Sequence, residues 1–150
     1  MDNIDKKIVR ELQLNARITN EELAEKVNLS PSPCLRRVKK LESKGILKGY
    51  TAVVDQVLCG LSMNVFLSVR LEKPDKQIMQ NFENAVSQLD EVLECYLMTG
   101  NRDYLLKVIS NDLKSYEAFI RDKFSNLPGI SSIESSFAFG HVKQQQFIPL

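Results

Sequence analysis

Apolar residues near the start of the chain recur with the spacing of helices. Ile4, Ile8 and Leu12 follow one another at intervals of four, which predicts a first helix of about three turns. A second, short helix should begin after Thr19, because threonine can cap a helix and Glu22 can bond back to the cap amide. Each of these helices has one apolar side, so we expect them to pack against other helices.

A third helix is expected after Asn28, a residue that tolerates the left-handed conformation in which helices often end. Ser30 suits the cap and Pro31 suits the first helical position, where the missing N–H has no cost. The helix should run to about Lys44 and end at Gly45. Two helices joined by a short turn at this spacing predict a helix-turn-helix.

Beyond residue 60 the pattern changes to alternation. Residues 63–71 alternate apolar and polar side chains, which predicts a strand. A helix from Pro74–Asp75, strands at 92–98 and 104–110, a helix capped by Asp112 and a last strand after Pro128–Gly129 complete the series. The order strand-helix-strand occurs twice, and it predicts a ferredoxin-like βαββαβ sandwich.

The predicted fold class is therefore α+β, with a winged helix-turn-helix domain followed by the ferredoxin-like domain. We expect the first domain at residues 1–49, a linker strand and hinge at 50–61, and the second domain at 62–150. The segment after Gly45 is predicted to form a small wing and then a strand over residues 50–55.

The two predicted domains differ in charge. Residues 1–50 hold eleven Lys/Arg against seven Asp/Glu, a balance of +4, whereas residues 51–150 hold nine against twelve, a balance of −3. The net charge of +1 hides this asymmetry, which indicates two modules with different partners.

Cationic residues on the third helix point away from its apolar side. At about 100° per residue, and with Val38 at the centre of the buried side, Arg36 and Lys40 lie about 160° away. Cys34, Leu35 and Leu41 all fall within about 60° of Val38, which is the side expected to be buried.

A charged helix face is often only a solvated surface. Here the charges are nearly all positive, they lie on the second helix of a helix-turn-helix, and small residues occupy its first turn, where such helices approach base edges in the major groove. We therefore expect the helix to bind double-stranded DNA. The predicted DNA-binding residues are Ser30, Ser32, Pro33, Arg36, Arg37, Lys40 and Lys44.

One face of the predicted sheet is left without helices. Phe66, Tyr96 and Phe137 are candidates to occupy that face. Because an exposed apolar face of this size usually marks association, we expect a homodimer formed through this domain, with higher assembly.

The turn at residues 99–104 fits two explanations. Gly100 allows backbone N–H groups to approach a carboxylate, and Asp103 can accept a hydrogen bond from an α-ammonium group. The same residues also suit a tight hairpin turn for purely conformational reasons.

The helix-turn-helix carrying LSPSPCLRRVKKLESKGILKGY and the second domain carrying TGNRDYLLKV together resemble the Lrp/AsnC family of bacterial and archaeal regulators. The resemblance covers essentially all 150 residues. It implies a recognition helix at 31–44 and a second domain that binds an amino-acid effector and assembles dimers of dimers, with an octamer as the expected state. Two features depart from the family pattern: Asn101–Arg102 in the turn, and Asn28 in place of a turn glycine.

The resemblance favours the ligand explanation of the turn. It implies that an amino acid binds between dimers beside the turn, with hydroxyls of the last strand added to the pocket. The expected effector-binding residues are Thr99, Gly100, Asn101, Asp103, Tyr104, Ser135 and Ser136. No other cofactor and no metal is expected.

An enzyme of amino-acid metabolism is the main alternative to a regulator. Catalysis needs a positioned group with a suitable pKa, but His141 is the single histidine and the cysteines have no evident base. No phosphate-binding loop or metal-ligand spacing occurs, so we do not expect an enzyme. An architectural DNA-binding protein without an effector remains the second alternative.

The sequence also predicts the compartment. It lacks an apolar run of about 18 residues and a secretory start, so no membrane span is expected. Three widely spaced cysteines fit reduced thiols. We expect a cytoplasmic, nucleoid-associated protein.

Overall fold

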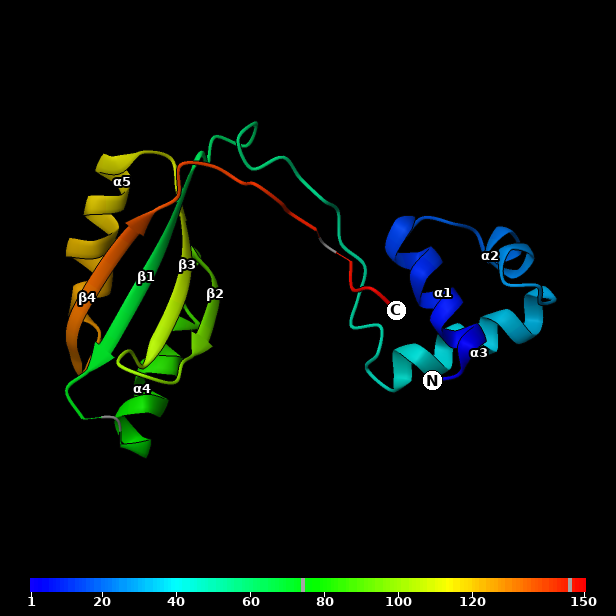
Figure 1. Ribbon diagram of the computed structural model, residues 1–150, viewed down its shortest axis with the longest axis horizontal. Coiled ribbons are helices and arrows are strands. Elements are labelled where there is room, and N and C mark those ends of the chain that lie inside the picture. The colour runs from blue at the N-terminus through cyan, green and yellow to red at the C-terminus, as the bar shows by residue number, and fades with distance from the viewer. Residues whose placement is uncertain (74, 146) are drawn as a thin grey trace. The chain divides into compact units, whose positions relative to one another are not determined.

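The computed structural model describes residues 1–73, 75–145 and 147–150 (Figure 1). The chain forms two compact units: an N-terminal unit of residues 1–53 with 143–150, and a sheet unit of residues 54–142. Among the described residues, no helix has the length and apolar character needed to cross a membrane.

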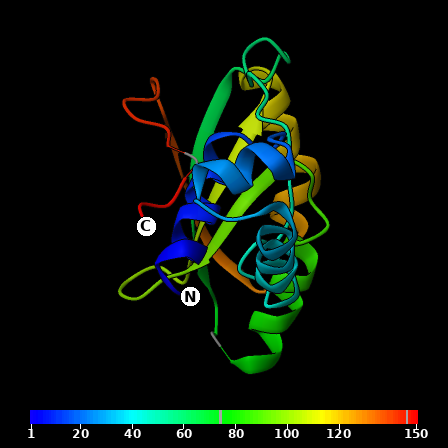
Figure 2. The same cartoon turned by 90° about the vertical axis from the view of Figure 1, so that its right-hand side faces the viewer.

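The N-terminal unit consists of α1 (Asn3–Leu14), α2 (Asn20–Lys26) and α3 (Pro31–Ser43), coloured blue to cyan in Figure 2. The predicted capping box of α2 is confirmed. The Glu22 amide donates to Thr19 Oγ1 at 3.2 Å, and the Thr19 amide donates to the Glu22 carboxylate at 2.9 Å. The predicted helix-turn-helix is therefore present.

The ends of α2 and α3 also follow the expected chemistry. Asn28 adopts a φ of 56°, the left-handed conformation expected after α2, and Gly45 adopts a φ of 67° just after α3. Ser30 occupies the cap position of α3, but its side chain makes no capping hydrogen bond. The Ser30 hydroxyl therefore does not cap the start of α3.

Apolar side chains from all three helices form the core of the N-terminal unit. The buried members are Ile8, Val9, Leu12, Leu23, Ala24, Val27, Cys34 and Leu41, with Val38 packed against them. Leu35, expected at the edge of the buried side, is instead 42% exposed. Cys34, Val38 and Leu41 are the residues of α3 that pack in or against this core, and Leu35 lies outside it.

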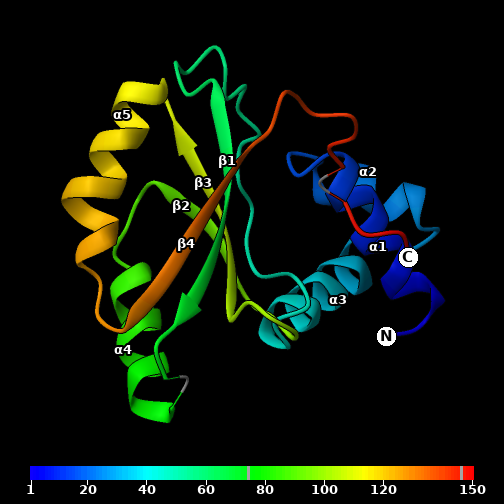
Figure 3. The same ribbon diagram turned by 60° about the vertical axis from the view of Figure 1, so that its left-hand side comes forward.

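The sheet unit consists of β1 (Met63–Leu71), α4 (Lys76–Val86), β2 (Val92–Leu97), β3 (Tyr104–Ser110), α5 (Leu113–Ala118) and β4 (Ile130–Phe137). The sheet order is β2-β3-β1-β4 and all neighbours are antiparallel. Figure 3 shows α4 and α5 on the same face of the sheet. This is the expected ferredoxin-like arrangement. Asp75 caps α4 as predicted, whereas Pro74 lies outside the described residues.

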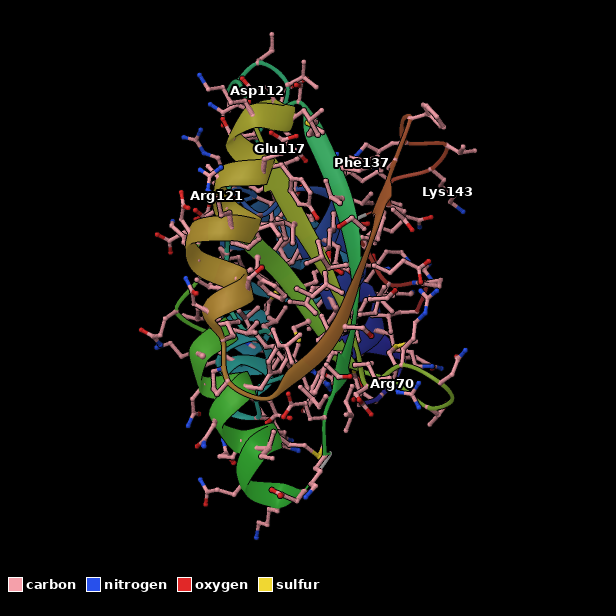
Figure 4. All side chains as sticks on the ribbon, turned by 90° about the vertical axis from the view of Figure 1, so that its left-hand side faces the viewer. Arg70, Asp112, Glu117, Arg121, Phe137 and Lys143 are labelled. Atoms are coloured by element: carbon pink, nitrogen blue, oxygen red, sulfur yellow. The ribbon has the colours of Figure 1, made fainter. Side chains whose placement is uncertain are left out.

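The helix-covered face of the sheet forms the second core. Val65, Leu67 and Val69 of β1 are fully buried there, together with Phe82 of α4 and Phe124. The chain after α5 continues through a π-helical turn, Phe119–Lys123, and a 3-10 turn, Phe124–Asn126. Figure 4 shows the charged side chains Asp112, Glu117 and Arg121 along the outer side of this helical segment.

The open face of the sheet is less apolar than expected. Phe66 and Tyr96 lie on it and are 38% and 52% exposed. Phe137 does not, because it pairs with the inward-facing Val65 across the β1–β4 ladder and packs edge-on against Tyr116 at 5.3 Å. The prediction for Phe137 is wrong because alternation identifies two faces of a strand but not which of them is covered.

The wing and the strand predicted after Gly45 are absent from the described part of the chain. Residues 46–62 contain no strand, and Val53 and Val54 are 70% and 68% exposed. A strand needs a neighbour to bond its backbone N–H and C=O groups. No such neighbour is present within the described residues of this one chain.

The C-terminal segment lies with the N-terminal unit, although the sequence assigned it to the second domain. Gln13 of α1 makes two hydrogen bonds with the backbone of Ile148, donating at 3.2 Å and accepting at 2.7 Å. Leu150 packs against the core of the three helices. Side-chain-to-backbone pairing of this kind leaves no pattern in the sequence.

Gly129, just before β4, allows a test of how closely Ile78 of α4 packs against the chain there. It has a φ of +76°, and an added Cβ would lie 2.5 Å from Ile78 Cγ2. Gly129→Ala should destabilise the protein by about 2–4 kcal/mol, which combines left-handed strain with a steric clash. Urea unfolding measures this.

Gly60→Ala is the matched control. Gly60 has a φ of +80° but open space around it, so its substitution should cost only the strain, about 1–2 kcal/mol. Equal losses in the two variants would contradict the packing of Ile78 on Gly129.

Candidate nucleic-acid interface and ligand turn

The recognition helix α3 is held on one side by the core and at its start by α2. Cys34 is completely buried and Leu41 is 2% exposed. The side-chain amide of Asn20, in the first turn of α2, donates to the Pro31 carbonyl at 2.9 Å. These contacts fix the rotation of α3 about its axis.

The predicted DNA-binding residues lie on α3 or at its two ends, with Ser32 and Arg36 on the side of the helix opposite Cys34. Ser30, Ser32, Arg36, Lys40 and Lys44 are exposed, and Pro33 is half-buried. Among residues 1–73, 75–145 and 147–150, the side chains of Arg36, Lys40 and Lys44 form no ion pair. Their positive charge is therefore directed to solvent.

Glu42, the one carboxylate on α3, is engaged with another residue. The Tyr50 hydroxyl donates to Glu42 Oε1 at 2.9 Å. Partial burial, followed by this carboxylate, raises the pKa of Tyr50 to about 12, so the phenol keeps its proton. Glu42 thus faces Tyr50 and not the cations of α3.

Arg37 differs from the other predicted contacts. Its Nη1 lies 2.6 Å from Asp2 Oδ2 and 2.7 Å from Asp5 Oδ1, so this guanidinium is paired with the start of α1. The pKa of Asp2 is lowered by the Asp5 amide and then by Arg37. Burial alone would raise the pKa of Asp5, but the Asp2 amide and Arg37 outweigh it and lower the pKa. All three groups are therefore charged at neutral pH.

The predicted ligand turn lies between β2 and β3. Thr99, Gly100 and Asn101 are exposed there, and Gly100 adopts a φ of +104° that disfavours other residues. The turn is closed by a hydrogen bond from the Met98 amide to the Asp103 carbonyl at 2.8 Å. These three residues form one accessible surface.

Asp103 anchors the turn to β1. Its Oδ2 accepts from the Leu71 amide at 2.7 Å, and its own amide donates to the Val69 carbonyl at 2.9 Å. The aspartate therefore has a structural role, as in the conformational explanation of the turn that the sequence left open, although its bonds to β1 were not predicted.

Tyr104 is 1% exposed and belongs to the core. Its hydroxyl donates to Glu83 Oε1 at 2.8 Å, and burial, then this carboxylate, raises its pKa. Tyr104 borders a hollow of about 340 Å³, which is also lined by Glu83, Val86, Ser87, Cys95 and Leu97. Tyr104 is thus separated from the exposed part of the turn.

The two predicted serines do not lie together. Ser135 points to the helix side, with its Oγ 2.6 Å from the Tyr116 hydroxyl, whereas Ser136 pairs with Phe66 on the open face. Successive residues of a strand point to opposite faces, so at most one of them can face any single pocket.

Arg102 was noted in the sequence only as a departure from the family pattern. It reaches from the turn across the open face, where its guanidinium lies 2.8 Å from Glu134 and also donates to the Ser68 hydroxyl. The strand alternation places Ser68 and Glu134 on this face. It does not reveal that a turn residue bonds them.

The described residues contain no cluster of side chains that could hold a metal ion. No group of three or more His, Cys, Asp or Glu side chains comes together among them. Burial raises the pKa of Cys34, and burial together with Glu83 raises the pKa of Cys95 to about 11. Both thiols are thus protonated at neutral pH, which disfavours a nucleophile.

The two units of the chain each match a known protein-family model. Residues 1–48 match the model of a winged helix-turn-helix DNA-binding domain, and residues 64–147 match the Lrp/AsnC ligand-binding domain. The chain is 38% identical over 144 residues to the leucine-responsive regulatory protein of Escherichia coli K12, covering 96% of this chain and 88% of that protein.

Solved structures are similar to nearly the whole of this chain. A transcriptional regulator from Neisseria meningitidis, in complex with L-Met, is 37% identical with a TM-score of 0.92, covering 99% of this chain and 96% of that one. An AsnC family transcriptional regulator from Agrobacterium tumefaciens is 35% identical with a TM-score of 0.94, covering 99% and 97%.

The anchoring part of Asp103 can be tested by stability. Asp103→Ala leaves the partly buried Leu71 amide without its acceptor and should cost about 1–3 kcal/mol. Asp103→Asn retains an oxygen that can accept this bond and should cost much less. Urea unfolding compares the two, and equal stability of the alanine variant and the wild type would contradict the anchor.

Proposed function

The chain belongs to the Lrp/AsnC family of DNA-binding transcriptional regulators, and from this premise we propose which of its residues contact DNA and which contact an amino-acid effector. The proposed DNA contacts are Ser30, Ser32, Pro33, Arg36, Lys40 and Lys44. The proposed effector contacts are Thr99, Gly100, Asn101 and Asp103.

The observation that carries the DNA proposal is the outward, unpaired positive side of α3. Ser32 and Pro33 in its first turn are small, so the helix can approach base edges closely. Arg36 and Lys40 lie about one helical turn apart on the same side. An exposed guanidinium at this place can bond guanine or a phosphate with two N–H groups.

The effector proposal rests on the shape of the ligand turn and on the bound L-Met of the Neisseria relative. Gly100 is exposed and has open space around it, so an amino-acid carboxylate can come close enough to accept hydrogen bonds from backbone N–H groups there. Asp103 uses Oδ2 to hold β1, and its Oδ1 remains for an α-ammonium group. We leave Tyr104, Ser135 and Ser136 out of this proposed site, because the first is in the core and the serines face opposite ways.

A homodimer with higher assembly, an octamer in the family pattern, is the proposed quaternary state. Its support is of two kinds: Phe66 and Tyr96 are exposed on the open face of the sheet, and residues 50–55, with the exposed Val53 and Val54, have no strand partner within the described chain. A second copy of the chain can cover these apolar side chains and can pair with the backbone of residues 50–55. As a DNA-binding regulator, the protein is proposed to act in the cytoplasm on the nucleoid.

The proposed contacts predict the salt dependence of DNA binding. If each protomer neutralises about four phosphates, the slope of log K against log salt for a dimer should be near −7. Arg36→Ala should weaken binding to a duplex selected from a random pool by about 1–3 kcal/mol. Fluorescence anisotropy over a salt series measures both quantities.

Lys114→Ala on α5 is the control, because it removes one charge from the sheet unit and should leave binding unchanged. A wild-type slope shallower than about −3 would contradict the contact count. An Arg36→Ala variant that binds the selected duplex as tightly as the wild type would remove Arg36 from the interface.

The effector proposal predicts calorimetric heat with at least one of the twenty amino acids, and a change of assembly in light scattering on the same samples. Asp103→Asn keeps the acceptor for Leu71 but removes the negative charge, so it should lose about 1.5–3 kcal/mol of amino-acid binding. Asp112→Asn, at the cap of α5, should bind as the wild type does.

Heat with none of the amino acids would instead support an architectural DNA-binding protein that senses no effector. A monomer at every concentration tested would contradict the proposed assembly. The chemistry of the described residues and the regulators among the relatives give no support to an enzyme.

A further inference from the structure

The capping box of α1 is joined to the recognition helix through one guanidinium. Asp2 Oδ1 accepts from the Asp5 amide at 2.8 Å, and an Asp5 oxygen accepts from the Asp2 amide at 3.1 Å. The remaining oxygens, Asp2 Oδ2 and Asp5 Oδ1, both accept from Arg37 Nη1. Every oxygen of the two carboxylates is therefore bonded, and Arg37 uses Nη1 for both of its bonds.

The network lies beside the proposed DNA contacts. Asp2, Asp5, Arg36, Arg37 and Lys40 border the same hollow of about 400 Å³. Two carboxylates face one guanidinium, so the network carries a net charge of −1 next to the cations of α3. A phosphate that approaches the remaining N–H groups of Arg37 also approaches both carboxylates, which offsets the attraction.

We propose that Asp2 and Asp5 withhold Arg37 from the DNA backbone, so that Arg37 serves as a positioning residue that ties α3 to α1. This inference rests on the proposed contact of α3 with DNA. Phosphate contacts add affinity without sequence information, whereas base contacts provide specificity. Withholding one arginine beside Arg36 and Lys40 lowers the affinity for random DNA and thereby raises the ratio of specific to non-specific binding.

The ion pairs of Arg37 with Asp2 and Asp5 are formed at neutral pH. The folded-state pKa of each aspartate is lowered from its ordinary value of 3.8. The ion pairs are therefore complete above that value and are lost only as the pH falls through the lowered pKa values. Near neutral pH, these ion pairs are therefore broken by substitution and not by a change of protonation.

The test is a double-mutant cycle with the full-length protein on a random-sequence duplex. In Asp2→Asn/Asp5→Asn, Arg37 is released, and one added phosphate contact per protomer should steepen the salt slope by about 0.9 for each protomer bound. At 0.1 M salt this corresponds to roughly tenfold tighter random binding per protomer. Binding to a selected duplex should gain less, because Arg37 is then less well positioned.

Arg37→Gln completes the cycle. In the wild-type background it should leave the slope unchanged, since Arg37 contacts no phosphate there. In the Asp2→Asn/Asp5→Asn background it should abolish the steepening. Asp112→Asn removes one negative charge from a helix cap in the sheet unit; it controls for net charge against the single variant Asp2→Asn and should leave the slope unchanged.

Folding of each variant is checked by thermal unfolding. Asparagine is itself a good helix cap, so we expect the double variant to fold. If the double variant does not fold, Asp2→Asn alone tests the same effect. This single variant should steepen the slope by a smaller amount. The inference is overturned if release of the carboxylates leaves the slope unchanged, or if Arg37→Gln flattens it equally in both backgrounds. Failure of the DNA proposal is a distinct result, because wild-type binding itself would then lack a steep slope.

Discussion

Burial of one side of α3 is the constraint on which the DNA-binding surface depends. Cys34 and Leu41 pack completely into the core of three helices, and Asn20 holds the start of α3 at the Pro31 carbonyl. A helix fixed on one side must present its other side to solvent, and on α3 that side carries Arg36 among its cations. The charge of this surface is thus a consequence of packing. A cavity-forming change at Leu41 would therefore affect DNA binding without touching a DNA contact.

In the ligand turn, one aspartate is proposed to have two roles. Asp103 holds β1 through Oδ2, which fixes the turn, and the proposed ammonium contact uses the other oxygen. Arg102 adds a second tether, because it reaches Glu134 on β4. A turn held to two strands is rigid before a ligand arrives, and such pre-organisation lowers the entropic cost of binding.

Local chemistry could be predicted from the sequence, whereas partners distant in the chain could not. The caps at Thr19 and Asn28 depend on residues within a few positions and were predicted correctly. The pairing of Arg37 joins residues more than 30 positions apart, and charge pattern alone does not identify a partner. Phe137 was assigned to the wrong face because alternation separates the two faces of a strand but does not tell which face the helices cover. The strand at 50–55 was expected from the residue pattern after Gly45 and from the family resemblance, but a strand forms only where its backbone finds a neighbour.

Site-specific photo-crosslinking tests the central claim most directly. A photoreactive side chain at position 32 lies on the outward side of the first turn of α3, and one at position 115 lies on α5 of the sheet unit. The account predicts crosslinks to duplex DNA from position 32 and none from position 115. Crosslinks from position 32 to a second protein chain in place of DNA would show that the cationic side of α3 is a subunit contact, and would contradict the account.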